Sequence, residues 1–119
     1  MERTTLSERR DFWERTAERF AKDGIRAVCN PTAIGWLNKR ADYLHITCLD
    51  PFLEDCRGLV VLDVGCEVGR WTSRLLDHGA EVVGIDISRK MVLQAKKSKK
   101  EKQKCEFVAS SVSNLPFKD

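Results

Sequence analysis

Two glycines and an acid are the residues of this chain whose types and spacing best suit the binding of a ligand. Gly65 and Gly69 bracket a turn in the segment LVVLDVGCEVGRW, residues 59–71, and Asp86 ends the next apolar run. Glycine adopts positive φ and leaves room for a ligand, and a helix that begins at such a turn offers free N–H groups. An acid at the end of the next strand can accept hydrogen bonds from two ribose hydroxyls. The pattern predicts a site for an adenosine-type ligand; the alternative is a glycine turn and a helix-capping Asp with no ligand.

The turn departs from the dinucleotide-binding fingerprint G-x-G-x-x-G. Counted from Gly65, the second and third glycines of that fingerprint are replaced by Glu67 and Arg70. A carboxylate at Glu67 would repel a pyrophosphate at close range, which disfavours a dinucleotide cofactor and a nucleotide-dependent oxidoreductase. A positively charged ligand without phosphate fits Asp63 and Glu67 better.

The elements that must position these residues alternate between strand and helix. The apolar run 59–64 is typical of a strand buried on both faces. We expect further strands over 81–85 and 105–109, and helices over 69–78 and 88–97, the second capped by Ser88. This alternation predicts an α/β fold with a parallel sheet, right-handed crossovers and flanking helices.

The first half of the chain predicts helices only. Ser7 is placed to cap a helix over about 7–21, and Thr32 a second one whose apolar positions include Trp36 and Leu44. The segment 50–58, DPFLEDCRG, has an acid, a proline and a final glycine at positions that favour a separate short helix. We therefore divide the chain into an N-terminal helical segment, 1–57, and an α/β domain, 58–119.

The composition of the chain argues against several kinds of partner and location. The 119 residues are 42% hydrophobic and 33% charged, with no apolar signal core at the N-terminus and no membrane span, which predicts a cytoplasmic protein. The net charge of +3 and a lysine-rich stretch without interleaved aromatic residues argue against a nucleic-acid partner. Neither a zinc-binding spacing nor a disulfide framework is present, so we expect no metal site and reduced thiols at Cys29, Cys48, Cys56, Cys66 and Cys105.

Three segments resemble the first three motifs of class I S-adenosylmethionine-dependent methyltransferases. They are VVLDVGCEVGRW, VVGIDISRKMVLQAKK and FVASSVSNLPFKD, within residues 58–119. The similarity is closest to the group that acts mostly on small molecules, which includes the ubiquinone and menaquinone biosynthesis enzymes. It implies a Rossmann-like fold, S-adenosyl-L-methionine as cofactor and a small-molecule acceptor. The segment FWERTAERF also resembles the helix that precedes this domain and folds over the cofactor, where Trp13 is either a core residue or a lid contact.

The resemblance places the first motif around the methionine end of the cofactor. Asp63, Gly65, Cys66 and Gly69 would surround it, with an acid near its amino group. The family usually has glycine where this chain has Glu67, so the side chain must point away from the cofactor or weaken its binding. The position of Cys66 at a helix N-terminus favours a lowered thiol pKa, although contact through its backbone is the simpler interpretation.

The other two motifs would hold the adenosine end. Asp86 would accept hydrogen bonds from the ribose hydroxyls, and Ile87 would lie against the adenine. Ser111 and Val112 would lie where the family contacts the adenine ring and its amino group, but the family usually has Asp in place of Ser111. A hydroxyl lacks the charge of a carboxylate, so this difference also predicts weaker binding. No catalytic residue is assigned, since His45 and His78 fit packing, capping or surface positions.

The resemblance further implies a seven-stranded sheet, of which this chain supplies three strands in the order 3-2-1. The fourth strand of the family pairs with the first, so the strand at 59–64 is expected to be an open edge that invites pairing with another chain or a second copy. The chain is then a fragment truncated before strand four, a truncated product that needs a partner, or a degenerate relative. The predicted function is the cofactor half of a methyltransferase; the alternative is a catalytically inactive module that completes its sheet on a partner.

Overall fold

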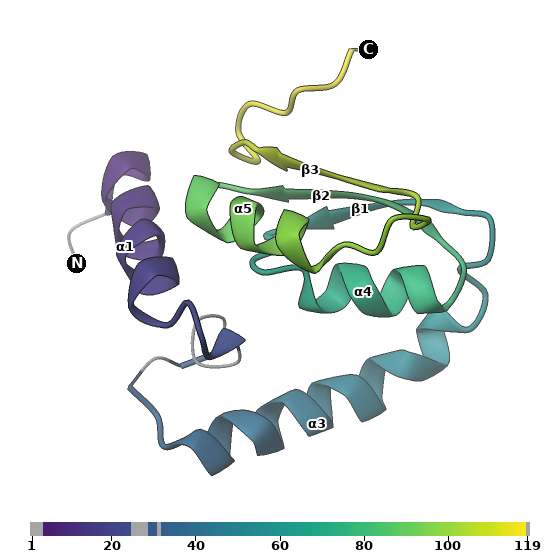
Figure 1. Ribbon diagram of the computed structural model, residues 1–119, viewed down its shortest axis with the longest axis horizontal. Coiled ribbons are helices and arrows are strands. Elements are labelled where there is room, and N and C mark those ends of the chain that lie inside the picture. Colours follow the sequence, from purple (N-terminus) through teal and green to yellow (C-terminus); the bar gives the residue numbers. More distant parts are fainter. Residues whose placement is uncertain (1–3, 25–28, 31, 119) are drawn as a thin grey trace.

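The computed structural model describes residues 4–24, 29–30 and 32–118 and builds them around a three-stranded parallel sheet (Figure 1). The strands are β1 (Val60–Val64), β2 (Glu81–Asp86) and β3 (Cys105–Ala109), and they lie in the order β1-β2-β3. The expected parallel sheet and its strand order are therefore confirmed. In Figure 1 the arrowheads of all three strands point toward the N-terminal helix α1, so the carboxyl ends of the strands face that helix.

Helices α4 (Arg70–Asp77) and α5 (Arg89–Ser98) connect the strands and cover one face of the sheet. Ser88 caps α5, as expected, because its hydroxyl accepts a hydrogen bond from the Met91 N–H at 3.1 Å. The main core lies between these helices and the sheet, and its buried residues are Cys56, Cys66, Leu75, Ala80, Val82, Val92, Ala95, Cys105 and Phe107.

The opposite face of β1 is open. Val60, Leu62 and Val64 are 75%, 40% and 53% exposed. The expectation that this strand is buried on both faces is wrong, because the helices α4 and α5 lie on the other face of the sheet and β2 is the one neighbour that β1 has among the described strands. The expected open edge at β1 is confirmed for the part of the chain that the structure describes.

Helix α1 (Leu6–Arg19) begins one residue earlier than expected. Its cap is Thr5 rather than Ser7: the Thr5 hydroxyl accepts a hydrogen bond from the Glu8 N–H at 3.2 Å, and the Glu8 carboxylate accepts one from the Thr5 N–H at 2.7 Å. This reciprocal capping box provides acceptors for the backbone N–H groups of Thr5 and Glu8. A helix capped at Ser7 would not form this pair of hydrogen bonds.

Helix α1 is anchored to α5. Ala17 is fully buried against Met91, and the side-chain amide of Gln94 donates a hydrogen bond to the Ala17 carbonyl at 2.9 Å. Lys90 and Glu18 form a salt bridge of 3.1 Å across the same boundary. These contacts fix α1 beside the start of α5 and therefore beside the carboxyl ends of the strands.

Helix α3 (Gly35–Leu53) replaces the two separate helices that the sequence predicted. Thr32 does not cap it, since Ile34 occupies the cap position without a side-chain hydrogen bond. Pro51 lies inside the last turn, where its missing N–H removes one backbone hydrogen bond, the one to Thr47. A single lost bond so close to the end does not break the helix, so the proline gave a false signal of a new start.

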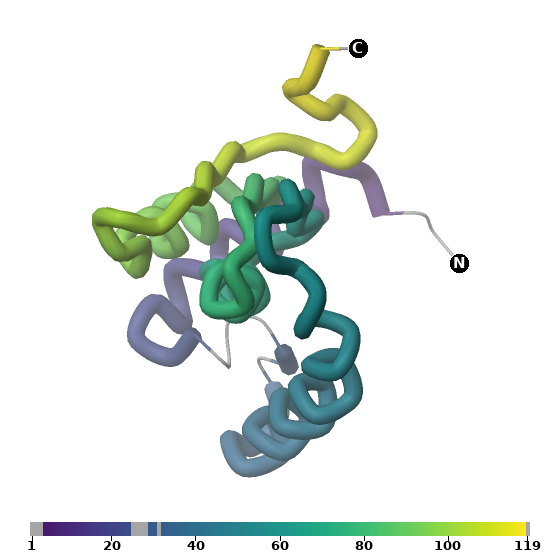
Figure 2. The backbone as a smooth tube through the Cα atoms, turned by 90° about the vertical axis from the view of Figure 1, so that its right-hand side faces the viewer, coloured from purple at the N-terminus to yellow at the C-terminus, as the bar shows by residue number. Residues whose placement is uncertain are grey.

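Helix α3 lies apart from the C-terminal segment, at the opposite end of the molecule, with the strands between them (Figure 2). It is held to α4 by two ion pairs, Asp42 with Arg70 and Asp50 with Arg74, the second at 2.7 Å. Asn38 is buried and donates a hydrogen bond from its side chain to the carbonyl of Asn30 at 2.8 Å. No described helix combines the length and the apolar character that crossing a membrane requires.

Candidate functional site

The turn between β1 and α4 is built from left-handed backbone. Gly65, Glu67 and Gly69 have φ values of 75°, 54° and 85°. The N–H groups of Gly65 and Cys66 both donate to the carbonyl of Ile85, at 2.8 and 2.9 Å, so the turn folds over the end of β2. A Cβ atom added at Gly65 would meet no atom within 4 Å. The space over Gly65 is therefore open to a ligand.

Gly69 and Cys66 form the side of the turn that faces the core. A Cβ at Gly69 would lie 3.3 Å from both the Ala95 Cβ and the Phe107 Cζ, so this glycine allows the helix to pack closely. The Cys66 side chain is buried, and burial together with the nearby Asp86 raises the pKa of its thiol. The expectation of a lowered thiol pKa at the helix N-terminus is wrong, because α4 begins only at Arg70, and burial together with the carboxylates of Asp86 and Asp63 disfavours the thiolate.

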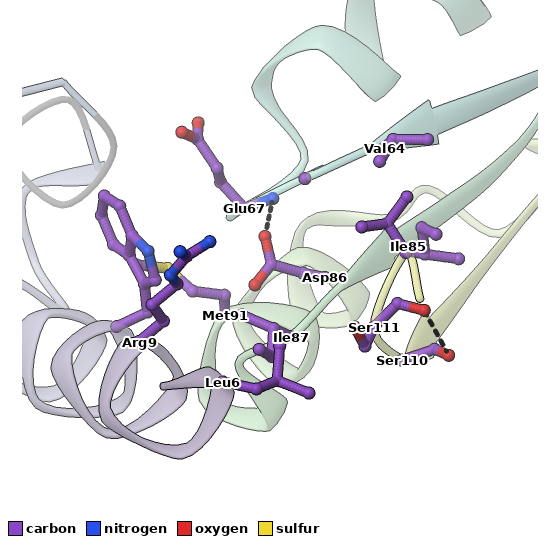
Figure 3. Close-up of a pocket in the computed structure, with 13 residues that line it drawn as sticks. Leu6, Arg9, Val64, Glu67, Ile85, Asp86, Ile87, Met91, Ser110 and Ser111 are labelled. Carbon is purple, nitrogen blue, oxygen red and sulfur yellow. Dashed lines mark hydrogen bonds between the residues drawn. The ribbon is translucent and has the colours of Figure 1, made fainter. Parts of the chain in front are cut away.

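Asp86 joins the turn to the end of β2. Its Oδ2 accepts a hydrogen bond from the Glu67 N–H at 2.9 Å (Figure 3). Its Oδ1 accepts one from the Ser88 N–H at 2.8 Å. Burial raises the pKa of the Asp86 carboxyl, and these two hydrogen bonds oppose the rise. Because each carboxylate oxygen can accept a second hydrogen bond, Asp86 can hold the turn and still accept hydrogen bonds from the hydroxyl groups of a ligand.

The first cavity, of about 280 Å³, lies between α1 and the carboxyl ends of the strands. It is lined by most of the residues predicted for the cofactor, namely Gly65, Glu67, Asp86, Ile87, Ser111 and Val112. Its volume is near the lower limit of small-molecule pockets. The other predicted residues do not line it; they are Asp63, Cys66 and Gly69.

Helix α1 adds wall residues that the sequence analysis did not assign. Leu6 and Arg9 line the first cavity together with Trp13, which had remained open between a core and a lid position. The spacing of three and four residues puts them on one face of α1, and this periodicity is the signal that could have found Arg9. In the part of the chain that the structure describes, no hydrogen bond or salt bridge engages the Arg9 guanidinium.

A second cavity, of about 600 Å³, lies between α3 and the end of β1. Val64, Gly65 and Glu67 line both cavities, so the two adjoin at the turn. Asp63 faces this second space, and its Oδ2 accepts a hydrogen bond from the Thr72 hydroxyl at 2.5 Å. The remaining wall residues are Cys29, Asn30, Ala33, Leu37, Asn38, Ala41, His45, Arg70 and Trp71.

Glu67, which lines both cavities, has a carboxyl group with a strongly raised pKa. Burial raises the pKa of its carboxyl to about 7, Arg70 lowers that pKa, and the acids Asp86 and Asp63 raise it further. No hydrogen bond or salt bridge holds the carboxylate within the described residues, since Arg70 is itself paired with Asp42. The same residues, 4–24, 29–30 and 32–118, include no group of three His, Cys, Asp or Glu side chains suited to a metal ion.

Comparisons with known proteins agree on one kind of domain. Residues 61–119 match a family model described as a methyltransferase domain. A demethylmenaquinone methyltransferase of Staphylococcus saprophyticus is 35% identical over 65 residues, which are 52% of this chain and 28% of the relative.

Solved structures extend the similarity to the N-terminal helices. Magnesium protoporphyrin IX methyltransferase from Synechocystis PCC 6803, crystallised with bound SAH, superposes with a TM-score of 0.70 at 25% identity. That match covers 92% of this chain and 53% of the Synechocystis chain. A putative S-adenosylmethionine-dependent methyltransferase from Listeria monocytogenes gives a TM-score of 0.53 at 28% identity, over 59% of this chain and 33% of its own. The chain therefore spans about half or less of the length of these relatives.

Proposed function

We propose that this chain, which through residues 61–119 belongs to the class I S-adenosylmethionine-dependent methyltransferase family, binds S-adenosylmethionine in the first cavity and serves methyl transfer to a small-molecule acceptor. The observation that carries the proposal is the open space over Gly65 beside the carboxylate of Asp86. A backbone without a side chain and an acid with spare acceptor capacity suit a nucleoside that has no phosphate.

The adenosine end would lie along the ends of β2 and β3. Asp86 would accept hydrogen bonds from the ribose hydroxyls while it keeps its two backbone donors. Ile87 would supply an apolar surface for the adenine ring. The consecutive residues Ser111 and Val112 line the same cavity and would contact one edge of that ring. The Ser111 hydroxyl accepts from the Ser113 N–H at 3.1 Å, which leaves its proton to donate.

The methionine end would lie at the glycine turn, between the two cavities. Gly65 provides the open surface there, and Cys66 contributes backbone rather than thiol chemistry because its side chain is buried. Asp63 faces the second cavity and is oriented by the Thr72 hydroxyl, which suits it to an ammonium group.

S-adenosylmethionine supplies a methyl group that its sulfonium has already activated. The chain's own contribution is therefore to position the two reactants and to exclude water. We assign the acceptor to the second cavity, because it meets the first one at Val64, Gly65 and Glu67. A general base is required only for an acceptor that must lose a proton, and the proposal assigns none.

A catalytically inactive, methyltransferase-like interaction module is the second candidate. The open edge of β1 favours it, since the unpaired backbone of an edge strand is suited to pairing with another chain or a second copy. The exposed Val60, Leu62 and Val64 add an uncovered apolar face to the same strand. Glu67 and Ser111, which replace the usual glycine and aspartate of the family, also favour it. Both candidates keep the division into a helical segment, 1–57, and an α/β domain, 58–119, and a cytoplasmic location as predictions.

Calorimetric titration of this chain with S-adenosylhomocysteine separates the two candidates. We expect binding to the wild type, no binding of NADH, and at least a ten-fold loss of affinity in Asp86→Asn, which keeps the size of the side chain. Glu106→Gln is the matched control, because Glu106 is exposed on β3 away from both cavities. A chain that circular dichroism shows to be folded but that binds nothing would favour the interaction module.

A further inference from the structure

Glu67 is the charged side chain that lies where the two cavities meet. We infer that it makes the site select the positively charged S-adenosylmethionine over the neutral product S-adenosylhomocysteine. The inference rests on the proposed function and adds a property to it: the turn would favour the methyl donor over the product that remains after transfer. Glu67 is thus a specificity-determining residue, and no role in the chemical step is assigned to it.

The position of Glu67 follows from the two cavity walls. Donor and acceptor must meet where their cavities join, and Val64, Gly65 and Glu67 form that junction. Val64 is apolar and Gly65 has no side chain, so Glu67 supplies the only charge among these three shared residues. With the cofactor and the acceptor bound as proposed, a carboxylate there would face the sulfur of the cofactor.

The carboxylate of Glu67 is available to a ligand. Its backbone N–H binds Asp86, while Figure 3 shows its side chain extending away from Asp86. Among the described residues it has neither a hydrogen bond nor a salt bridge. The guanidinium of Arg70, which acts on it at longer range, is bound to Asp42 on α3. A cation in the junction would therefore meet a carboxylate that is not already neutralised by a direct partner.

The charges around Glu67 come from each element that forms the junction. Arg70 begins α4, Asp63 lies on β1 and Asp86 ends β2, while Arg9 on α1 lines the first cavity. On α3, Asp42 is paired with Arg70 and the titratable side chain of His45 lines the second cavity. Burial, with a smaller contribution from the two acids, raises the pKa of Glu67 to about 7 against the opposing effect of Arg70. Near neutral pH the group is thus partly protonated, and a bound cation would draw it into its ionised form.

The sign of the pH effect follows from this coupling. A cation beside a carboxyl lowers its pKa, so the binding of the sulfonium ligand releases protons and strengthens as pH rises. A neutral thioether has no such effect. We therefore expect the affinity for S-adenosylmethionine to increase between pH 6 and pH 8, while the affinity for S-adenosylhomocysteine changes little.

Titration calorimetry with both ligands at pH 6, 7 and 8 tests the inference. In the wild type, proton release, measured in buffers of different ionisation enthalpy, should accompany binding of S-adenosylmethionine only. In Glu67→Gln, the preference for S-adenosylmethionine over S-adenosylhomocysteine should fall about ten-fold at pH 8, which is the effect of one partly screened charge pair. The control Glu106→Gln, with the same loss of charge on exposed β3, should keep the wild-type ratio.

A second variant covers the case in which Glu67→Gln does not fold. Glu67→Gly removes the charge and suits the left-handed φ of 54°, so it should fold and show the same loss of preference even if both ligands bind more tightly. An unchanged ratio of the two dissociation constants in either folded variant would overturn the inference while leaving the proposed function intact. Absence of binding of both ligands to the folded wild type would overturn the proposed function and the inference together.

Discussion

The carboxylate of Asp86 accepts a hydrogen bond from the backbone N–H of Glu67 at 2.9 Å, across nineteen residues of sequence. This bond ties the turn after β1 to the end of β2, and the second carboxylate oxygen ties the same strand end to the N–H of Ser88, at the start of α5. One side chain therefore orders the two backbone segments that frame the first cavity, and its role in stability can be measured separately from the role in binding that we propose for it.

Asp86→Ala should lower the free energy of unfolding by about 2 kcal/mol. The substitution removes the acceptor of two backbone N–H groups, and a buried donor without a partner costs about 1–3 kcal/mol. Asp86→Asn retains one acceptor oxygen and should lose about half as much. Urea denaturation followed by circular dichroism measures both, and an Asp86→Ala variant as stable as the wild type would show that water replaces the carboxylate.

Glu67→Gly should raise the free energy of unfolding by about 1 kcal/mol. Glu67 is the one residue other than glycine with positive φ among the described residues, and a side chain is disfavoured in that conformation. The same variant should bind S-adenosylhomocysteine more tightly, since it removes the side chain from a position where the family usually has glycine. Chemical denaturation and calorimetry provide the two measurements. Weaker binding by a stabilised variant would contradict the alignment of this motif.

Gly84→Ala should lower the free energy of unfolding by about 2 kcal/mol or more. A Cβ at this position would lie 2.7 Å from Cδ1 of Phe107 and 3.0 Å from the Cβ of Cys66, inside the core. Gly35→Ala is the matched control, because a Cβ there meets nothing within 4 Å. Equal stabilities of the two variants would mean that the Phe107 ring moves aside without cost.

The strands were predictable because their signals are local. β3 has the predicted limits 105–109, and β2 extends the predicted 81–85 by Asp86 alone, since each apolar run is bounded by polar residues or glycine. The two helices of the N-terminal half were less predictable. Pro51 is typical of a helix start, and only the position of this residue within the last turn of α3 shows why the helix continues.

The candidate site was predictable where it depends on motifs and not where it depends on packing. The turn and the strand-end acid were identified from glycine spacing and the position of Asp86, and the structure brings both to one cavity. Arg9 was missed because a charged residue is ordinarily assigned to the solvent face of an amphipathic helix, although its spacing from Leu6 and Trp13 places it on the face that lines the first cavity. The separation of Asp63 into the second cavity depends on α3, whose placement rests on ion pairs of Asp42 and Asp50 that no local pattern predicts.

Ser111→Asp should tighten the binding of S-adenosylhomocysteine. Ser111 lines the first cavity at a position where the family usually has Asp, and a carboxylate accepts a hydrogen bond from an amino group more strongly than a hydroxyl does. The expected gain is about three- to ten-fold in the dissociation constant, measured by calorimetry. Ser113→Asp, two residues away and exposed, controls for the added charge. Unchanged or weaker binding in Ser111→Asp alone would contradict the assignment of the third motif to the adenine.

The stability of the wild type should fall as pH rises from about 5 to about 7.5, because of Glu67. Its pKa is raised from the ordinary value of 4.5 to about 7 in the folded chain, so in this range the folded state keeps a proton that the unfolded state has released. Stability then decreases with increasing pH, by the linkage of proton binding to folding. Glu67→Gln cannot titrate but keeps the same left-handed backbone, so the difference between the two urea denaturation curves isolates this group from Asp86 and the other acids. Parallel pH profiles for the wild type and the variant would show that the Glu67 carboxyl reaches solvent and titrates near its ordinary pKa.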